Sequence, residues 1–473
     1  TTLTNGSRTT YHRLIEVLPH TSSLNVDKHG YRLFSVEHSI FSAKVRAYLR
    51  FKTDQDDLGP GYEDILATPH LINELLLIRS GSPSLPQLQT PDDDWVQDSS
   101  AIVDHLENVH PRSSIIPDLD TRPNQRLACY LIELLADEWL IVPACWERWY
   151  FSRTDIEPNH RQFNEQQWGA FLKPEGDGLA RRAAGSRFFK RAFGIENPVE
   201  APKGPFQGLI ELGCTSETRD AWLQTQHKVL RALEAHLEQH DYVLGGRPSL
   251  ADFSLLGPTY AHFFRDHVAG FELRTRYPLV SEWVERTNAE NCTNARRFGQ
   301  PLYKINSDGD LVGYEAMSDQ GAWLENDEVP ETVNAIVNIF FEEMWPYLCD
   351  SIETLSRFIA SDLHDLESEL PRKTFTATPG FEAFQTGEGA LTVPFTLNGI
   401  KSRRMVVPYQ IWMLQRIASA MVGCDLTATS AWLATFNRGE EILELDNRLA
   451  RCRITKQGGL LYSTGSIEDI AIA

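Results

Sequence analysis

The residue best placed to do chemistry is Ser39, which stands between a short strand and a helix. The strand is Arg32–Val36, and the helix is indicated by apolar residues at Phe41, Val45, Tyr48 and Leu49. A helix N-terminus presents unpaired N–H groups and the positive end of the helix dipole. It therefore stabilises an anion such as a thiolate and lowers the pKa of a bound thiol. Ser42 is a second candidate, and plain helix capping is the alternative role for Ser39.

Two further pieces lie downstream of this turn. Leu85-Pro86 enters a strand that runs to Leu88, and Asp98-Ser99 caps a helix that ends at Glu107. A main chain turned outward at a cis-proline can pair with a peptide as an added strand does. With another strand at Tyr62–Leu66 and a short helix at Pro69–Ile78, this order of elements predicts a thioredoxin-like α/β half-domain over residues 31–110.

These pieces resemble the glutathione-binding domain of soluble glutathione transferases. The pattern Leu33-Phe34-x-x-x-x-Ser39 resembles the serine-type, theta-like members, in which the serine hydrogen-bonds the sulfur of glutathione. Cysteine-type members carry Cys at this step, so mixed-disulfide chemistry is not expected. The proline that commonly follows is replaced here by Ile40.

The resemblance implies a role for each matching residue. Ser39 would be the catalytic residue, and glutathione would be the co-substrate. Pro86 would be the cis-proline that exposes the main chain of Leu85 to the tripeptide. Ser99 would hold the γ-glutamyl carboxylate, and Asp98 would receive the ammonium group.

The glycine carboxylate of glutathione needs a cation from elsewhere. Many relatives carry Lys where this chain has Ser84. His70, Arg79 and Lys52 are the alternatives, and the sequence does not decide between them. His38, beside Ser39, is a candidate base, although a histidine at a turn is usually solvated.

A helical domain is predicted over residues 122–300, with an insertion near residues 152–215 that holds one helix at 179–193. The string Gly245-Gly246-Arg247-Pro248-Ser249-Leu250-Ala251-Asp252 resembles the helix-capping segment of the same family, so Ser249 and Asp252 are expected to be structural. The second substrate would lie against this domain near an aromatic cluster, although such stripes are more often core. The cluster comprises Trp139, Trp146, Trp149 and Tyr150.

Residues 301–473 go beyond the resemblance and predict an additional α+β domain whose role the sequence does not reveal. A long helix is expected over Glu331–Leu366, a hairpin turning at Asn398-Gly399, a helix from Pro408, and a last hairpin across Gly458-Gly459. Tyr409, Trp412 and Arg416 share one helical face, interpreted as packing. Residues 1–30 are expected to be a polar arm.

Composition narrows the choice of partners. The formal net charge of −20 disfavours nucleic acid and repels anionic ligands, so local groups must overcome that field. The sequence contains no apolar run long enough to span a membrane. The seven cysteines are scattered without metal-ligand spacing, so no metal is expected and the thiols are expected to be reduced, as in a cytoplasmic protein.

Three functions remain open at this stage. The first is attack of the bound glutathione thiolate on a hydrophobic electrophile, by an enzyme that forms a homodimer as its relatives usually do. The second is a noncatalytic binding or scaffold protein built on the same fold. The third is glutathione-dependent isomerisation or ether cleavage, which would use the same residues around glutathione.

Overall fold

The computed structural model describes residues 30–193, 205–289, 296–314, 321–361, 369–370, 391–424 and 426–464. The predicted N-terminal arm, apart from Gly30, and Cys292 lie outside these ranges. Along the described residues, no helix combines the length and the apolarity needed to cross a bilayer. The described cysteines all carry free thiols.

The N-terminal half-domain contains the predicted α/β arrangement. Its four-stranded sheet has the order β2-β1-β3-β4, with β1 and β2 parallel and the other pairs antiparallel. The strands are β1 (Tyr31–Ser35), β2 (Tyr62–Leu66), β3 (Gln87–Gln89) and β4 (Trp95–Gln97). The third strand begins two residues later than predicted, after a cis Leu85–Pro86 peptide bond. The short strand β4 was not predicted.

Two helices of this half-domain begin at the predicted polar residues. Ser39 is the N-cap of α1 (Ile40–Asp54), and Asp98 is the N-cap of α4 (Ser99–Val109). Between them lie α2 (Pro69–Leu71), the π-helical turn η1 (Ile72–Leu76) and α3 (Leu77–Ser80). The apolar stripe of α1 is buried in the core, which fixes the direction in which its N-terminus points.

The second part is helical. Its elements are α5 (Pro123–Glu138), α6 (Ile141–Tyr150), α7 (Arg161–Leu172), α8 (Gly178–Phe193), α9 (Pro205–Glu211), α10 (Arg219–Leu237), α11 (Leu250–Pro258), η2 (Thr259–Phe264), α12 (His267–Arg276) and α13 (Pro278–Thr287). Ser249 and Asp252 form the predicted capping box of α11. Asp252 also accepts a hydrogen bond from the Trp283 indole at 3.0 Å, so its role is structural.

The described residues of the insertion hold three helices, α7, α8 and α9, whereas the sequence predicted one near residues 179–193, which corresponds to α8. Helices α7 and α8 approach closely at two glycines. A Cβ on Gly169 would lie 1.9 Å from the carbonyl oxygen of Arg181, and one on Gly185 would lie 1.9 Å from that of Glu165. Only glycine fits either contact, so the two helices form a tight pair.

The C-terminal region mixes helices with three two-stranded sheets. Its elements are β5 (Leu302–Ile305), β6 (Leu311–Tyr314), η4 (Glu325–Asp327), α14 (Glu331–Ile339), η5 (Phe340–Met344), α15 (Trp345–Ile359), β7 (Thr392–Leu397), β8 (Ile400–Met405), α16 (Pro408–Ala420), α17 (Leu426–Leu433), η6 (Gly439–Glu444), α18 (Leu445–Leu449), β9 (Ile454–Gln457) and β10 (Leu460–Ser463). The predicted helix from Pro408 and both predicted hairpin turns are confirmed. The long helix predicted over Glu331–Leu366 is helical from Glu331 to Ile359, with the π-helical turn η5 in the middle, and its predicted last residues, 362–366, lie outside the described residues.

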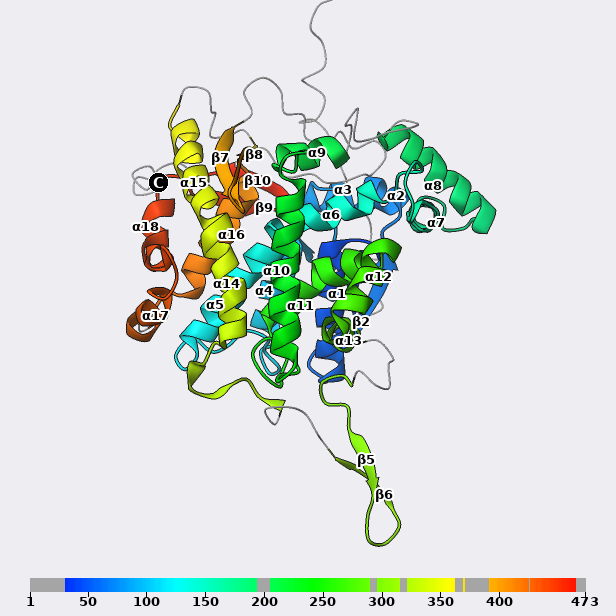
Figure 1. The fold of residues 1–473 in the computed structure, drawn as a ribbon. Coiled ribbons are helices and arrows are strands. Elements are labelled where there is room, and N and C mark those ends of the chain that lie inside the picture. The colour runs from blue at the N-terminus through cyan, green and yellow to red at the C-terminus, as the bar shows by residue number, and fades with distance from the viewer. Residues whose placement is uncertain are drawn as a thin grey trace, which may run out of the picture.

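This region does not stand apart from the rest. Helix α14 packs against α5 and α10, and α16 packs against α5, whereas Figure 1 shows the β5–β6 hairpin projecting away from the body. The buried residues of all three parts form one hydrophobic cluster. The predicted domain limits remain a prediction.

Candidate active site

One cavity brings together most of the predicted site residues. It is lined by Ser39, Leu85, Asp98 and Ser99, together with residues of α6, α7 and the C-terminal region. Pro86 is buried behind this surface and does not line the cavity. Its peptide bond with Leu85 is cis, as predicted.

Ser39 faces the cavity from the N-terminus of α1. Its Oγ accepts a hydrogen bond from the Ser42 N–H at 3.2 Å, which leaves the hydroxyl hydrogen able to donate. Ser42, the second candidate, is completely buried, and its Oγ accepts from the Val36 N–H at 3.4 Å. It does not line the cavity, so Ser39 is the serine in a position to meet a ligand.

The main chain of Leu85 has no partner within the part of the chain that the structure describes, since no hydrogen bond uses its N–H or C=O. The segment before it is held from the side. The Gln87 amide donates to the Ser82 and Ser84 carbonyls at 2.8 and 3.1 Å. The Leu85 main chain is therefore fixed in place and can pair with an extended peptide.

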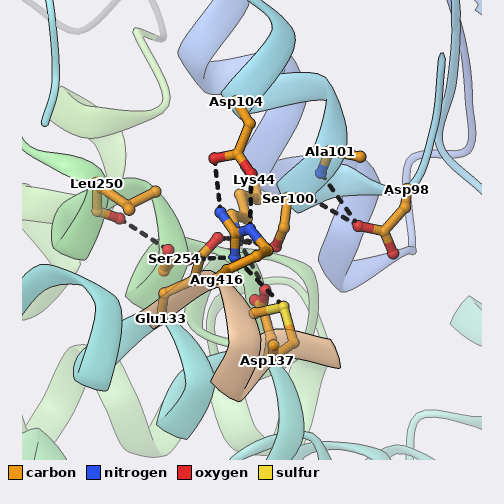
Figure 2. Close-up of polar contacts among 11 residues, drawn as sticks. Lys44, Asp98, Ser100, Ala101, Asp104, Glu133, Asp137, Leu250, Ser254 and Arg416 are labelled. Carbon is orange, nitrogen blue, oxygen red and sulfur yellow. Dashed lines mark hydrogen bonds and ion pairs between the residues drawn. The ribbon is translucent and has the colours of Figure 1, made fainter. Parts of the chain in front are cut away.

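Asp98 adopts an unusual backbone conformation at the start of α4. Its φ of 96° is rare for a residue with a side chain, and such strain clusters at functional sites. Its carboxylate accepts from the N–H groups of Ser100 and Ala101 at 3.0 and 3.3 Å, as Figure 2 shows. This leaves the N–H and hydroxyl of Ser99 without a partner among the described residues, at the positive end of the helix dipole.

His38 is buried against the cavity wall, which corrects the expectation of a solvated turn residue. Its ring lies 4.2 Å from that of Trp168, and its carbonyl accepts from Arg148 at 2.6 Å. Burial and the nearby positive charge of Arg148 hold the pKa of His38 well below its usual range. The ring is therefore neutral at physiological pH and forms part of the wall.

Part of the cavity wall is aromatic. Phe41, Trp149, Trp168 and Phe171 line it, and Trp168 stacks on Phe188 of α8 at 4.6 Å. Of the predicted aromatic cluster, only Trp149 lines the cavity. The others pack elsewhere: Trp139 is fully buried, and Trp146 stacks on Tyr150 at 4.4 Å.

Sequence reasoning missed several cavity residues. Trp168 and Phe171 belong to the insertion helix α7, whose irregular pattern carried no signal. Residues of the C-terminal region also line the cavity, namely Tyr409, Lys456, Gly459 and Leu461. Tyr409 was interpreted as a packing residue only.

The structure places none of the three candidate cations for the glycine carboxylate of glutathione at the cavity. Lys52 is fully buried in ion pairs with Asp57 at 3.1 Å and Glu107 at 3.0 Å, so it cannot reach a ligand. His70 and Arg79 do not line the cavity either.

Comparisons with known proteins give a consistent family. Residues 33–114 match the model of the glutathione S-transferase N-terminal domain, and residues 216–286 match that of the C-terminal domain. A search of curated proteins found no match.

Several solved structures resemble part of the chain. A glutathione S-transferase from Rhodospirillum rubrum is 17% identical, with 56% of this chain and 96% of that chain covered and a TM-score of 0.32. One from Methylobacterium radiotolerans, in complex with glutathione sulfonate, is 19% identical, with 57% and 97% covered and a TM-score of 0.33. A beta-etherase from Sphingobium sp. is 19% identical, with 55% and 96% covered and a TM-score of 0.34.

At these identities and TM-scores the solved structures do not bear on activity, so the assignment rests on the two domain matches and the sheet order. Both domain matches lie before residue 300 and leave the C-terminal region unmatched. The chain thus contains matches to both domains of the glutathione transferase superfamily and carries an additional C-terminal region.

Proposed function

We propose that the protein binds glutathione and catalyses attack of its thiolate on a hydrophobic electrophile. The observation that carries this proposal is the convergence of Ser39, the unpaired main chain of Leu85 and the start of α4 on one cavity. The three pieces lie far apart in sequence, yet they present a hydroxyl, a strand edge and a helix N-terminus to the same space.

In this proposal Ser39 holds the sulfur. Its hydroxyl donates to the thiolate while the N-terminus of α1 adds the favourable end of a helix dipole. The thiol proton leaves to water, and the sulfur lone pair forms a bond to the electrophilic carbon as the leaving group departs with its electron pair. Since both groups are fixed before the substrate arrives, no reorganisation is needed during the reaction.

The tripeptide is held by the groups that line the cavity. The cysteinyl residue of glutathione pairs with the main chain of Leu85. The carboxylate of the γ-glutamyl residue lies against Ser99, and the ammonium group of the same residue faces the Asp98 carboxylate. The aromatic wall of Trp149, Trp168 and Phe171 supports an apolar second substrate, because buried aromatic surface favours apolar ligands.

The test is the thiol pKa of bound glutathione, followed by ultraviolet absorbance of the thiolate. In the native protein this pKa is expected to fall below that of free glutathione. Because a hydrogen bond to a charged group contributes about 1.5–3 kcal/mol, Ser39→Ala should raise the thiol pKa by about 1–2 units and lower kcat/KM by about ten- to a hundredfold.

Ser39→Thr is the matched control, since it keeps the hydroxyl and should retain most of the effect. An unchanged thiol pKa in Ser39→Ala would remove Ser39 from the mechanism. Failure of the native protein to be retained on immobilised glutathione would favour the scaffold alternative. Isomerisation and ether cleavage differ in the fate of glutathione, which product analysis with a set of electrophiles reveals.

The homodimer and the cytoplasmic location expected from the family are proposals as well. Helix α16 lies against α5, and its Arg416 forms an ion pair with Asp104 of α4. A dimer interface formed by α4 and α5 would therefore have to include α16. Light scattering measures the assembly state directly.

A further inference from the structure

The C-terminal region closes the cavity at the end where α4 begins. The turn of the β9–β10 hairpin rests on the end of α3, where the Gly459 N–H donates to the Ser80 carbonyl at 2.8 Å. Gly458 has φ +57°, and a Cβ there would lie 2.4 Å from the same carbonyl oxygen. The position of the hairpin beside the proposed ligand is therefore fixed by its contact with the end of α3.

Lys456 of β9 carries a positive charge into this cavity. Its ammonium group donates to the Gln97 carbonyl and lies 5.2 Å from the centre of the Trp412 ring. Gln97 is two residues before Ser99, so the ammonium group lies close to the N-terminus of α4. The side chain is partly buried.

Among the described residues Lys456 has no ion-pair partner, although the Asp98 and Asp104 carboxylates act on its pKa from a greater distance. Within the described ranges, no carboxylate oxygen lies within ion-pair distance of its Nζ. The other cationic side chain that lines the cavity, Arg148, is paired with Asp266 at 2.8 Å. Buried lysines elsewhere are paired too: Lys44 contacts both Glu133 and Asp137.

A cation that is withdrawn from water without a counter-ion is costly, and an anionic ligand removes this cost. Burial lowers the pKa of Lys456, while the nearby Asp98 carboxylate acts in the opposite direction. Ser99 offers an unused N–H and hydroxyl at the same place. An ammonium group, a hydroxyl and a helix N-terminus together form a site for one carboxylate.

We propose that Lys456, together with Ser99, binds the carboxylate of the γ-glutamyl residue of glutathione, so that the C-terminal region completes the ligand site. This inference rests on the proposed binding of glutathione. It also supplies a local positive charge that offsets the formal net charge of −20 for an anionic ligand.

The test is calorimetric titration with two ligands that cannot react. One is S-methylglutathione, and the other is its analogue in which a γ-aminobutyryl group replaces the γ-glutamyl residue, which removes only that carboxylate. Lys456→Met should lower the affinity for S-methylglutathione by about ten- to a hundredfold. The analogue should bind weakly and equally to the native protein and to Lys456→Met.

Two variants serve as controls. Lys401 is an exposed lysine on β8 of the same region, so Lys401→Met should change neither titration. Lys456→Arg keeps the charge and should retain most of the affinity. Thermal unfolding checks each variant, and Lys456→Gln is measured in place of Lys456→Met if the latter does not fold.

The outcomes separate this inference from the proposed function. Failure of the native protein to bind S-methylglutathione overturns both. Binding by the native protein with less than a twofold change in Lys456→Met overturns the role of Lys456 alone. An equal loss for both ligands also overturns it, because Lys456 would then act through packing of the hairpin.

Discussion

Replacement of Arg416 by Met is the sharpest test of how the C-terminal region is joined to the rest. Figure 2 shows Arg416 of α16 among residues of α1, α4 and α5. Its guanidinium contacts Asp104 at 2.7 and 2.8 Å and Glu133 at 2.8 Å. Glu133 is completely buried and shares Lys44 with Asp137, at 2.6 and 2.7 Å.

Without Arg416, Lys44 alone faces two buried carboxylates. Removal of one member of a buried charge cluster typically costs about 3–5 kcal/mol, because a charge is left in a medium of low dielectric constant. Asp104 is partly exposed and adds little, since water can solvate it. We therefore expect Arg416→Met to lower the free energy of unfolding by about 3–5 kcal/mol at neutral pH.

Urea unfolding measures this loss, and Arg276→Met is the control. Arg276 pairs with Glu272 on the surface, and its loss should cost less than about 1 kcal/mol. The double variant Arg416→Met, Glu133→Gln should regain part of the lost stability, because the uncompensated charge is gone. A loss below about 1 kcal/mol for Arg416→Met, or no recovery in the double variant, would refute the reasoning.

The pH dependence gives the same test an independent readout. Burial raises the pKa of Glu133, but Arg416 and Lys44 outweigh burial and hold this pKa at about 2. A carboxyl whose pKa is lowered by folding stabilises the folded state at pH values above its pKa in the unfolded chain, 4.5. This contribution disappears as the pH falls toward 2. In Arg416→Met the folded-state pKa of Glu133 should rise, so the stability lost as pH falls from 4.5 should be smaller and the loss should end at a higher pH.

Two further variants test buried polar groups away from the cavity. Burial raises the pKa of Glu147 to about 8, so the folded protein binds a proton that the unfolded chain loses above pH 4.5. The free energy of unfolding therefore falls as pH rises toward 8, by an amount on the order of 4 kcal/mol. Glu147→Gln should abolish this loss, which unfolding at mildly alkaline pH measures. Equal pH profiles for the native protein and the variant would contradict this. Buried Arg404 donates to the Leu212 and Glu138 carbonyls at 3.0 and 2.9 Å. Arg404→Met should therefore lower the free energy of unfolding in urea by about 2–5 kcal/mol, and the control Arg403→Met, at an exposed residue, by less than about 1 kcal/mol. Similar losses for the two variants would refute the distinction.

The N-terminal half-domain was predictable because its signals are local. A strand, a polar cap and an amphipathic helix lie within a few residues of Ser39, and the Leu85-Pro86 pair marks the third strand. Strand β4 escaped because three residues carry no readable alternation. Helix α7 of the predicted insertion escaped because it has no regular apolar stripe.

The cavity was only half predictable, since its composition depends on contacts between distant segments. Lys456 lies 359 residues after its partner Gln97, and nothing in the sequence of β9 shows which face meets the cavity. The apolar spacing of the helix after Ser39 gives no sign that Lys44 and Arg46 are buried in ion pairs, as both are. Periodicity indicates apolar faces, but it does not reveal the partner of a buried charge.

The position of α16 has a consequence for attempts to trim the protein. An excised fragment that ends near residue 300 would match the family in length, yet it would expose Glu133 and the fully buried Trp139 to solvent. Glu133 belongs to α5 and Trp139 caps its C-terminus, and α14 and α16 pack against this helix. The transferase portion of this chain is therefore not a self-sufficient module, and its smallest workable form includes the helices that follow it.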